Sequence, residues 1–125
     1  MTTVKVVDTS ALAALLFGEP DAEDVAARLD GARFAAPGLL GFELANVCAT
    51  KCRRHPGQRG ALLAAFRLRE RLAIQEIAVD HAGALEIALA TGLTAYDASY
   101  LWLARQLGAE LVTLDKKLRA AARIR

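Results

Sequence analysis

The chain has 125 residues, of which 54% are hydrophobic and 24% are charged. This composition excludes an intrinsically disordered protein, and the length predicts a single domain, residues 1–125, whose core needs no disulfide or structural metal. Sixteen Lys and Arg against fourteen Asp and Glu give a net charge of +2, so a strongly basic or strongly acidic protein is excluded. The longest apolar run, residues 11–17, is far shorter than the roughly 18 residues of a membrane helix, so we expect no membrane segment. The N-terminus shows no export leader, and we expect a cytoplasmic protein.

The first half of the chain predicts two short strands among four helices. Apolar, β-branched residues predict the first strand, and helical spacing between Gly and Pro stops predicts each helix. The strands are expected at residues 4–7 and 33–36, and the helices from residue 9 or 10 to 18, from 21 to 30, from 38 to 54 and from 58 to 72.

The second half alternates strand and helix more regularly. Strands are expected at residues 74–79 and 110–114. One helix is expected over residues 81–92, a second over 98–108, where it ends at Gly108, and a third from Asp115 onward. Strands that alternate with helices are typical of a mostly parallel sheet covered on both faces. The sequence therefore predicts an α/β fold.

Three aspartates directly follow expected strands. They are Asp8, Asp80 and Asp115, and each leads into a helix. In open α/β sheets, ligands bind beyond the carboxyl ends of the strands, so all three are candidate site residues. Asp is also a preferred residue at helix N-termini, and for each of the three taken alone this capping role is the stronger interpretation.

Two further acids lie on expected helices. Thr94 and Asp97 match a capping box, which competes with a functional role for Asp97. Glu43 shares a helix face with apolar residues, where a carboxylate needs a partner or a proton, although a solvated glutamate is the alternative. Carboxylates gathered at one sheet edge repel one another, and a divalent cation relieves that repulsion. Oxygen ligands favour Mg²⁺ or Mn²⁺, ions that support phosphodiester hydrolysis.

Several other residues have a simpler structural interpretation. Cys48, Cys52 and His55 share a helical face but lack a clear fourth zinc ligand, so core cysteines and a helix-end histidine are expected. Tyr100 and Trp102 are expected in the core or at a partner contact.

Four segments together resemble the PIN-domain family, and more narrowly the VapC toxins of toxin and antitoxin pairs. They are VVDTSAL at 6–12, FELANV at 42–47, LTAYDASYLWLA at 93–104 and LVTLDKKL at 111–118. The resemblance spans nearly the whole chain in order and spacing. It implies a PIN-like three-layer fold with four to five mostly parallel strands flanked by helices.

The resemblance also implies a site of four acids. Asp8, Asp97 and Asp115 would hold Mg²⁺ or Mn²⁺ for endonucleolytic RNA cleavage, and Glu43 would position or deprotonate the attacking water. The hydroxyls of Thr9, Ser10 and Thr113 would orient the carboxylates, with capping and β-propensity as their simpler alternatives. Asp80 has no place in this set and is expected only as a helix cap. The implied partners are RNA, a VapB-like antitoxin and a second copy of the chain.

Basic residues beside these acids are candidates for holding RNA, with solvated surface as the alternative. Lys116 and Lys117 are the better placed; the others are Arg119, Lys51, Arg53, Arg54 and Arg59. With the four site acids set apart, ten acids remain against the sixteen bases. The net charge of +2 is therefore compatible with RNA binding once cations neutralise the site.

Two other functions remain open at this point. Asp8, Asp80 and Lys116 loosely imitate the phosphoaspartate site of a signalling receiver module, although that interpretation leaves Glu43 and Asp97 unexplained. The other is a PIN domain that binds RNA or a partner without cleavage, which the presence of all four acids disfavours.

Overall fold

The computed structural model describes residues 2–124, which form four strands and seven α-helices. The strands are β1 (Val4–Val7), β2 (Arg33–Pro37), β3 (Gln75–Ile77) and β4 (Glu110–Val112). The helices are α1 (Thr9–Phe17), α2 (Ala22–Leu29), α3 (Leu39–Arg54), α4 (Arg59–Arg67), α5 (His81–Thr91), α6 (Ala95–Leu107) and α7 (Lys116–Ala122). Two short 3₁₀ segments, η1 (Pro56–Gln58) and η2 (Leu68–Leu72), flank α4.

The four strands form one sheet in the order β3-β2-β1-β4, and every pair is parallel. Val6 of β1 lies opposite Ala35 of β2 and Leu111 of β4. The prediction of a parallel α/β sheet is confirmed. Because all strands point the same way, their carboxyl ends and the residues that follow them meet at one edge of the sheet.

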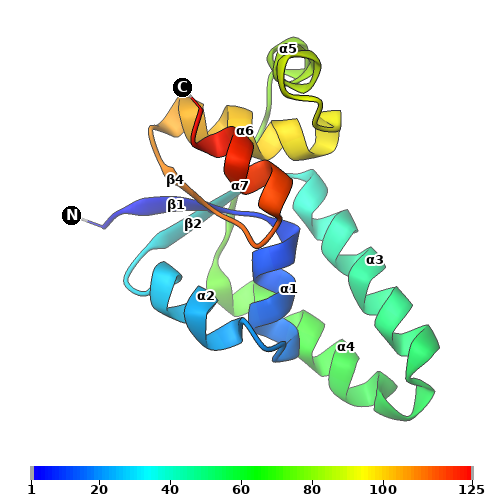
Figure 1. Cartoon of the computed structure of the whole chain (residues 1–125). Coiled ribbons are helices and arrows are strands. Elements are labelled where there is room, and N and C mark those ends of the chain that lie inside the picture. The colour runs from blue at the N-terminus through cyan, green and yellow to red at the C-terminus, as the bar shows by residue number, and fades with distance from the viewer. Residues whose placement is uncertain (1, 125) are drawn as a thin grey trace.

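Helices cover both faces of the sheet. In Figure 1, α5, α6 and α7 lie on one side of the strands and α1 and α2 lie on the other, while α3 and α4 form an antiparallel hairpin that extends away from the sheet. The core is aliphatic and includes Val6, Leu12, Leu44 and Leu103, each with no exposed surface. Burial of these side chains, at about 25 cal/mol per Å² of apolar surface, stabilises this arrangement.

The prediction is wrong in detail between residues 56 and 79. The single helix expected over 58–72 is a shorter α-helix, α4, between two 3₁₀ segments, and β3 covers three residues rather than six. Ala73 ends η2 with φ at 49°, a left-handed conformation unusual for a residue with a Cβ. No side chain of α4 is fully buried, so tertiary packing does little to extend its regular turns.

The helix ends follow the chemistry expected from the sequence. Asp80 caps α5 by accepting a hydrogen bond from the Gly83 N–H, as predicted, and Gly92 ends the same helix with φ at 75°.

Cys48 and Cys52 are both free thiols. Within residues 2–124, no helix combines the length and the apolar character needed to cross a membrane.

Candidate active site

Asp8 follows β1, one of the two central strands, and is 5% exposed. Its Oδ1 caps α1 by accepting from the Ala11 N–H at 3.0 Å and also accepts from the Ser10 hydroxyl at 2.8 Å. Its Oδ2 accepts a short hydrogen bond from the Thr113 hydroxyl. Burial raises the pKa of Asp8 above its ordinary value of 3.8, the three donors oppose that rise, and the charge of Asp115 adds to it. The capping and site interpretations of Asp8 are therefore compatible.

Asp115 lies beyond β4, the neighbour of β1, and its side chain is exposed. Oδ1 caps α7 through the Leu118 N–H at 2.9 Å, which is the capping role that the sequence predicted. The Asp115 N–H donates to the Thr113 hydroxyl at 3.0 Å, and that hydroxyl binds Asp8. Thr113 thus links the loops after the two strands and fixes their acids relative to each other.

Asp97 reaches the same region from the first turn of α6. Thr94 caps this helix by accepting a hydrogen bond from the Asp97 N–H at 3.1 Å, so the predicted helix cap is present. This hydrogen bond uses the backbone of Asp97 and not its carboxylate. Burial raises the pKa of Asp97 above 3.8, and the negative charges of Asp115 and Glu43 raise it further. The Thr94 hydroxyl and Lys117 act in the opposite direction. The fold therefore brings Asp97, Asp115 and Glu43 into one electrostatic environment.

Glu43 lies on α3 and is half-buried, and it has the partners that a carboxylate on an apolar helix face needs. Its Oε1 accepts from the Thr9 hydroxyl at 2.9 Å and from the Tyr100 hydroxyl at 2.6 Å. The two hydroxyls lie 3.1 Å apart. Three side chains from α1, α3 and α6 are thereby joined at one carboxylate oxygen, and in the described residues Oε2 accepts no hydrogen bond.

Tyr100 is the site residue that sequence reasoning missed. It was expected in the core, and its ring is indeed buried at 1% exposure, but its hydroxyl is the shorter of the two contacts to Glu43. The signal was its position three residues after Asp97, because residues three apart on a helix lie on the same face. Burial, and then the hydrogen bond to Glu43, raises the pKa of Tyr100, so this hydroxyl stays protonated and acts as a donor.

The three hydroxyls predicted beside the acids all contact a carboxylate. Ser10 and Thr113 bind Asp8, and Thr9 binds Glu43. Ser10 also accepts from the Leu114 N–H at 2.9 Å, which ties α1 to the loop after β4.

The chain is similar to known proteins in both sequence and fold. Residues 5–124 match the family model of the PIN domain. The chain belongs to the PIN-domain family. It is 31% identical over 118 residues to "Ribonuclease VapC3" of Pyrobaculum aerophilum, a match that covers 90% of each chain. The crystal structure of PAE2754 from the same organism superimposes with a TM-score of 0.78 at 25% identity, covering 98% of this chain and 86% of the other.

The donor set of this PIN domain suits a hard divalent cation. All four acids offer oxygen atoms as ligands. The negative charges of Asp115 and Glu43 disfavour the carboxylate form of Asp97, and a bound cation would offset this repulsion. Among residues 2–124, no three Asp, Glu, His or Cys side chains already stand in position to hold a metal ion. The acids nevertheless fit such an ion in the chemistry of their oxygen donors and in their negative charge.

The basic residues predicted for RNA fall into two groups. Lys116 and Lys117 are exposed at the start of α7, and Lys117 donates to the Gly92 carbonyl at 2.8 Å, beside the acids. On the α3 and α4 hairpin, Lys51 pairs with Glu19 at 3.5 Å, while Arg53, Arg54 and Arg59 are exposed. The first group is the one placed at the candidate active site.

Proposed function

We propose that this PIN domain is a Mg²⁺-dependent endoribonuclease of the VapC type, the toxin of a toxin and antitoxin pair. The observation that carries this proposal is the set of four acids near the carboxyl edge of the sheet, in which the charge of Asp115 acts on both Asp8 and Asp97 and the charge of Glu43 acts on Asp97. Similarity to a VapC ribonuclease over 90% of the chain supports the same reaction and substrate.

In the proposed mechanism Glu43 receives a proton from the attacking water. The hydroxyls of Thr9 and Tyr100 hold its Oε1, which fixes the carboxylate and leaves Oε2 to face the water. A general base must lie within hydrogen-bonding reach of the proton it takes, so this fixed orientation matters for the rate.

Asp8, Asp97 and Asp115 would hold Mg²⁺ or Mn²⁺. When bound, the cation lowers the pKa of water and stabilises negative charge on the phosphate under attack. Ser10 and Thr113 keep Asp8 in a single orientation by bonding its two oxygens. Lys116 and Lys117 would attract the RNA phosphates toward these acids.

The proposed partners are a VapB-like antitoxin and a second copy of the chain. Apolar side chains exposed on α3, α5 and α6 support the existence of protein contacts. They are Phe42 at 83%, Leu89 at 78% and Tyr96 at 66% exposure. Cytoplasmic action, where RNA and the antitoxin are both present, belongs to the same proposal.

The receiver alternative receives no support from the fold. Asp80 follows β3, Asp8 follows β1, and β2 lies between these two strands. Two strand spacings of about 4.8 Å therefore lie between the two aspartates, too far for a shared phosphoaspartate site.

The test is the incubation of single-stranded RNA, labelled at one end, with the purified protein and Mg²⁺. Internal cleavage that produces discrete fragments is expected. RNA that is retained on the protein but stays intact would instead support the alternative of a PIN domain that binds without cleaving.

Tyr100→Phe should lower kcat roughly tenfold and leave KM nearly unchanged, because the substitution removes one of the two hydroxyls that hold Glu43. Loss of this buried hydrogen bond is also expected to lower the free energy of unfolding by about 1 kcal/mol. Steady-state cleavage of a short RNA measures kcat and KM separately.

Two matched controls accompany Tyr100→Phe. Tyr96→Phe makes the same chemical change at an exposed position of the same helix and should leave kcat unchanged. Thr9→Ser keeps the second hydroxyl and should retain activity, whereas the nearly isosteric Thr9→Val should not. A normal kcat in both Tyr100→Phe and Thr9→Val would show that these hydroxyls do not position Glu43.

A further inference from the structure

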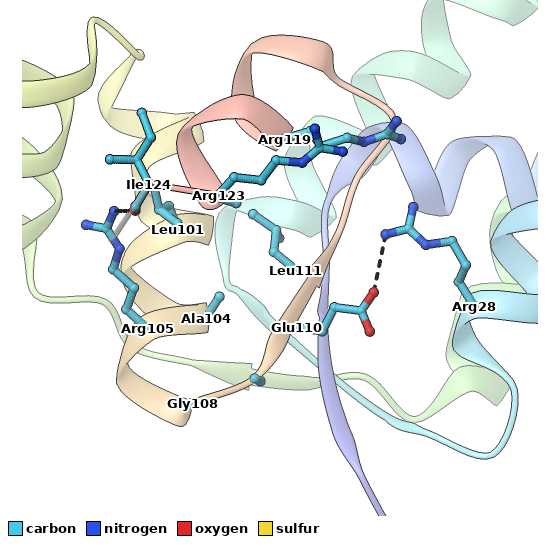
Figure 2. A pocket seen from close by; sticks show the side chains of 12 residues that line it. Arg28, Leu101, Ala104, Arg105, Gly108, Glu110, Leu111, Arg119, Arg123 and Ile124 are labelled. Carbon is cyan, nitrogen blue, oxygen red and sulfur yellow. Dashed lines mark hydrogen bonds and ion pairs between the residues drawn. The ribbon is translucent and has the colours of Figure 1, made fainter.

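A cavity of about 870 Å³ lies outside the acid site, along β4, one of the two outer strands of the sheet. We call it the arginine cleft. Four of its lining residues are arginines, Arg28, Arg105, Arg119 and Arg123, and one, Glu110, is acidic. In Figure 2, Arg119 extends from α7 and Arg123 from the position directly after this helix, Arg28 approaches Glu110 from α2, and Arg105 lies on α6.

The single acid of the cleft is already neutralised. Glu110 pairs with Arg28 at 3.3 Å and, through its other oxygen, with Lys5 at 3.3 Å. In residues 2–124 no ion pair involves Arg105, Arg119 or Arg123. The cleft therefore presents an uncompensated positive charge, and guanidinium groups favour phosphate and carboxylate ligands.

Arg119 provides a second, independent observation. Its Nη2 donates to the Thr113 carbonyl at 2.8 Å, but its Nε is buried and has no hydrogen-bond partner among the described residues. A buried donor without an acceptor is costly, so the hydrogen-bonding capacity of this guanidinium is not met by the Thr113 carbonyl alone, and a bound phosphate would add acceptors to the group.

The cleft is connected to the acid site by both sequence and structure. Arg119 lies on α7, and Asp115 and Arg123 are the N-cap and C-cap residues of that helix, each four residues away from Arg119 and therefore on the same side of the helix. The eight residues from Asp115 to Arg123 span roughly 12 Å at 1.5 Å per residue. Thr113, whose carbonyl binds Arg119, also binds Asp8 through its hydroxyl.

We propose that the arginine cleft binds the phosphate backbone of the RNA strand beyond the scissile bond. This inference rests on the proposed ribonuclease function and adds a substrate subsite to it. A strand that leaves the acids along α7 meets Arg119 and then Arg123, with Arg28 on the opposite wall. Contacts of this kind hold RNA of any sequence, because they reach phosphates rather than bases.

The test measures RNA binding separately from cleavage. Every protein carries Asp97→Asn and is kept free of metal, and the affinity for a long single-stranded RNA is measured by fluorescence anisotropy at several salt concentrations. Arg28→Gln combined with Arg123→Gln should weaken binding roughly tenfold and reduce the magnitude of the salt slope by about 1.4, at about 0.7 per phosphate contact. Arg123→Gln alone removes no ion pair of the described residues and should give about half of that change in slope.

The matched control is Arg67→Gln combined with Arg71→Gln, which removes the same charge from exposed positions near α4. The control pair should change the RNA affinity and the salt slope much less than the cleft pair does. In the cleavage-competent protein, Arg123→Gln should raise KM for the long RNA and leave KM unchanged for an oligonucleotide too short to span the 12 Å or so to Arg123.

Equal affinity and slope in the cleft pair and the parent protein would overturn the proposal, as would an equal loss in the control pair. The proposal would also be overturned, in favour of a protein ligand, if an acidic peptide bound the cleft and the cleft substitutions left the RNA affinity unchanged. Because binding is measured without cleavage, failure of the ribonuclease function would appear separately, as absence of cleavage by the parent sequence.

Discussion

Asp97→Asn is expected to abolish RNA cleavage and, in the absence of metal, to stabilise the protein. The pKa of Asp97 is raised by burial and by the charges of Asp115 and Glu43, which means that the folded state disfavours its carboxylate. Asparagine keeps the shape and removes the charge. We expect cleavage to fall by about 10³-fold, and the melting temperature of the metal-free protein to rise by only about 1 to 2 °C, because solvent screens much of the repulsion at this half-buried side chain.

The pH dependence of this gain has a definite sign. An acid whose pKa is higher in the folded state than in the unfolded state destabilises the fold once the pH exceeds both values. The advantage of Asp97→Asn should therefore be full near pH 7 and disappear as the pH falls toward 3.8, the ordinary value for Asp. Thermal melts of both proteins across this range, with chelator present, measure the effect.

Asp24→Asn provides the control for this substitution. Asp24 is exposed in the first turn of α2, so the change removes an equal charge without relieving a crowded site. It should keep full activity and show no gain in stability. If Asp97→Asn cleaved RNA normally, Asp97 would have no place in the reaction.

Removal of divalent metal is the second change with a large expected effect. EDTA should abolish cleavage, and Mg²⁺ or Mn²⁺ should restore it, because oxygen-only donors select hard cations. Cleavage that continues in excess chelator would contradict a metal-dependent mechanism.

Metal binding should also be visible without any cleavage. A ligand at a hundredfold excess over its Kd stabilises the folded state by about 2.7 kcal/mol, which corresponds to roughly 10 °C in melting temperature for a chain of this size. Mg²⁺ should produce a rise of this kind in the parent protein and a much smaller one in Asp97→Asn. An equal rise in both proteins would place the bound ion away from Asp97.

Much of the fold follows from local sequence signals. The helix predicted over residues 38–54 matches α3, since helical spacing runs without interruption from Gly38 to the His55-Pro56 stop. The segment after Pro56 was predicted less well. There the chain alternates between 3₁₀ and α geometry and ends in the left-handed Ala73, and neither feature has a signal in hydrophobic periodicity.

The candidate site shows the same division between local and tertiary information. Asp8 and Asp115 were candidates because each follows a strand and precedes a helix, but Asp80 has the same position, so it was the resemblance to the PIN-domain family that singled them out; both also cap those helices. The contact between Tyr100 and Glu43 was not recognisable, because it joins residues 57 positions apart and depends on how α6 packs near α3. Arg119 was predicted only as a basic residue near Asp115; its bond to the Thr113 carbonyl required the structure.

The most direct test of a metal-dependent ribonuclease at these acids is a side-by-side time course of RNA cleavage. Parent protein and Asp97→Asn, purified in parallel, are incubated with the same end-labelled single-stranded RNA in Mg²⁺. The expected result is progressive internal cleavage by the parent protein and intact RNA with the variant. Equal cleavage by both proteins, or none by the parent protein, would contradict the assignment of this reaction to the four acids.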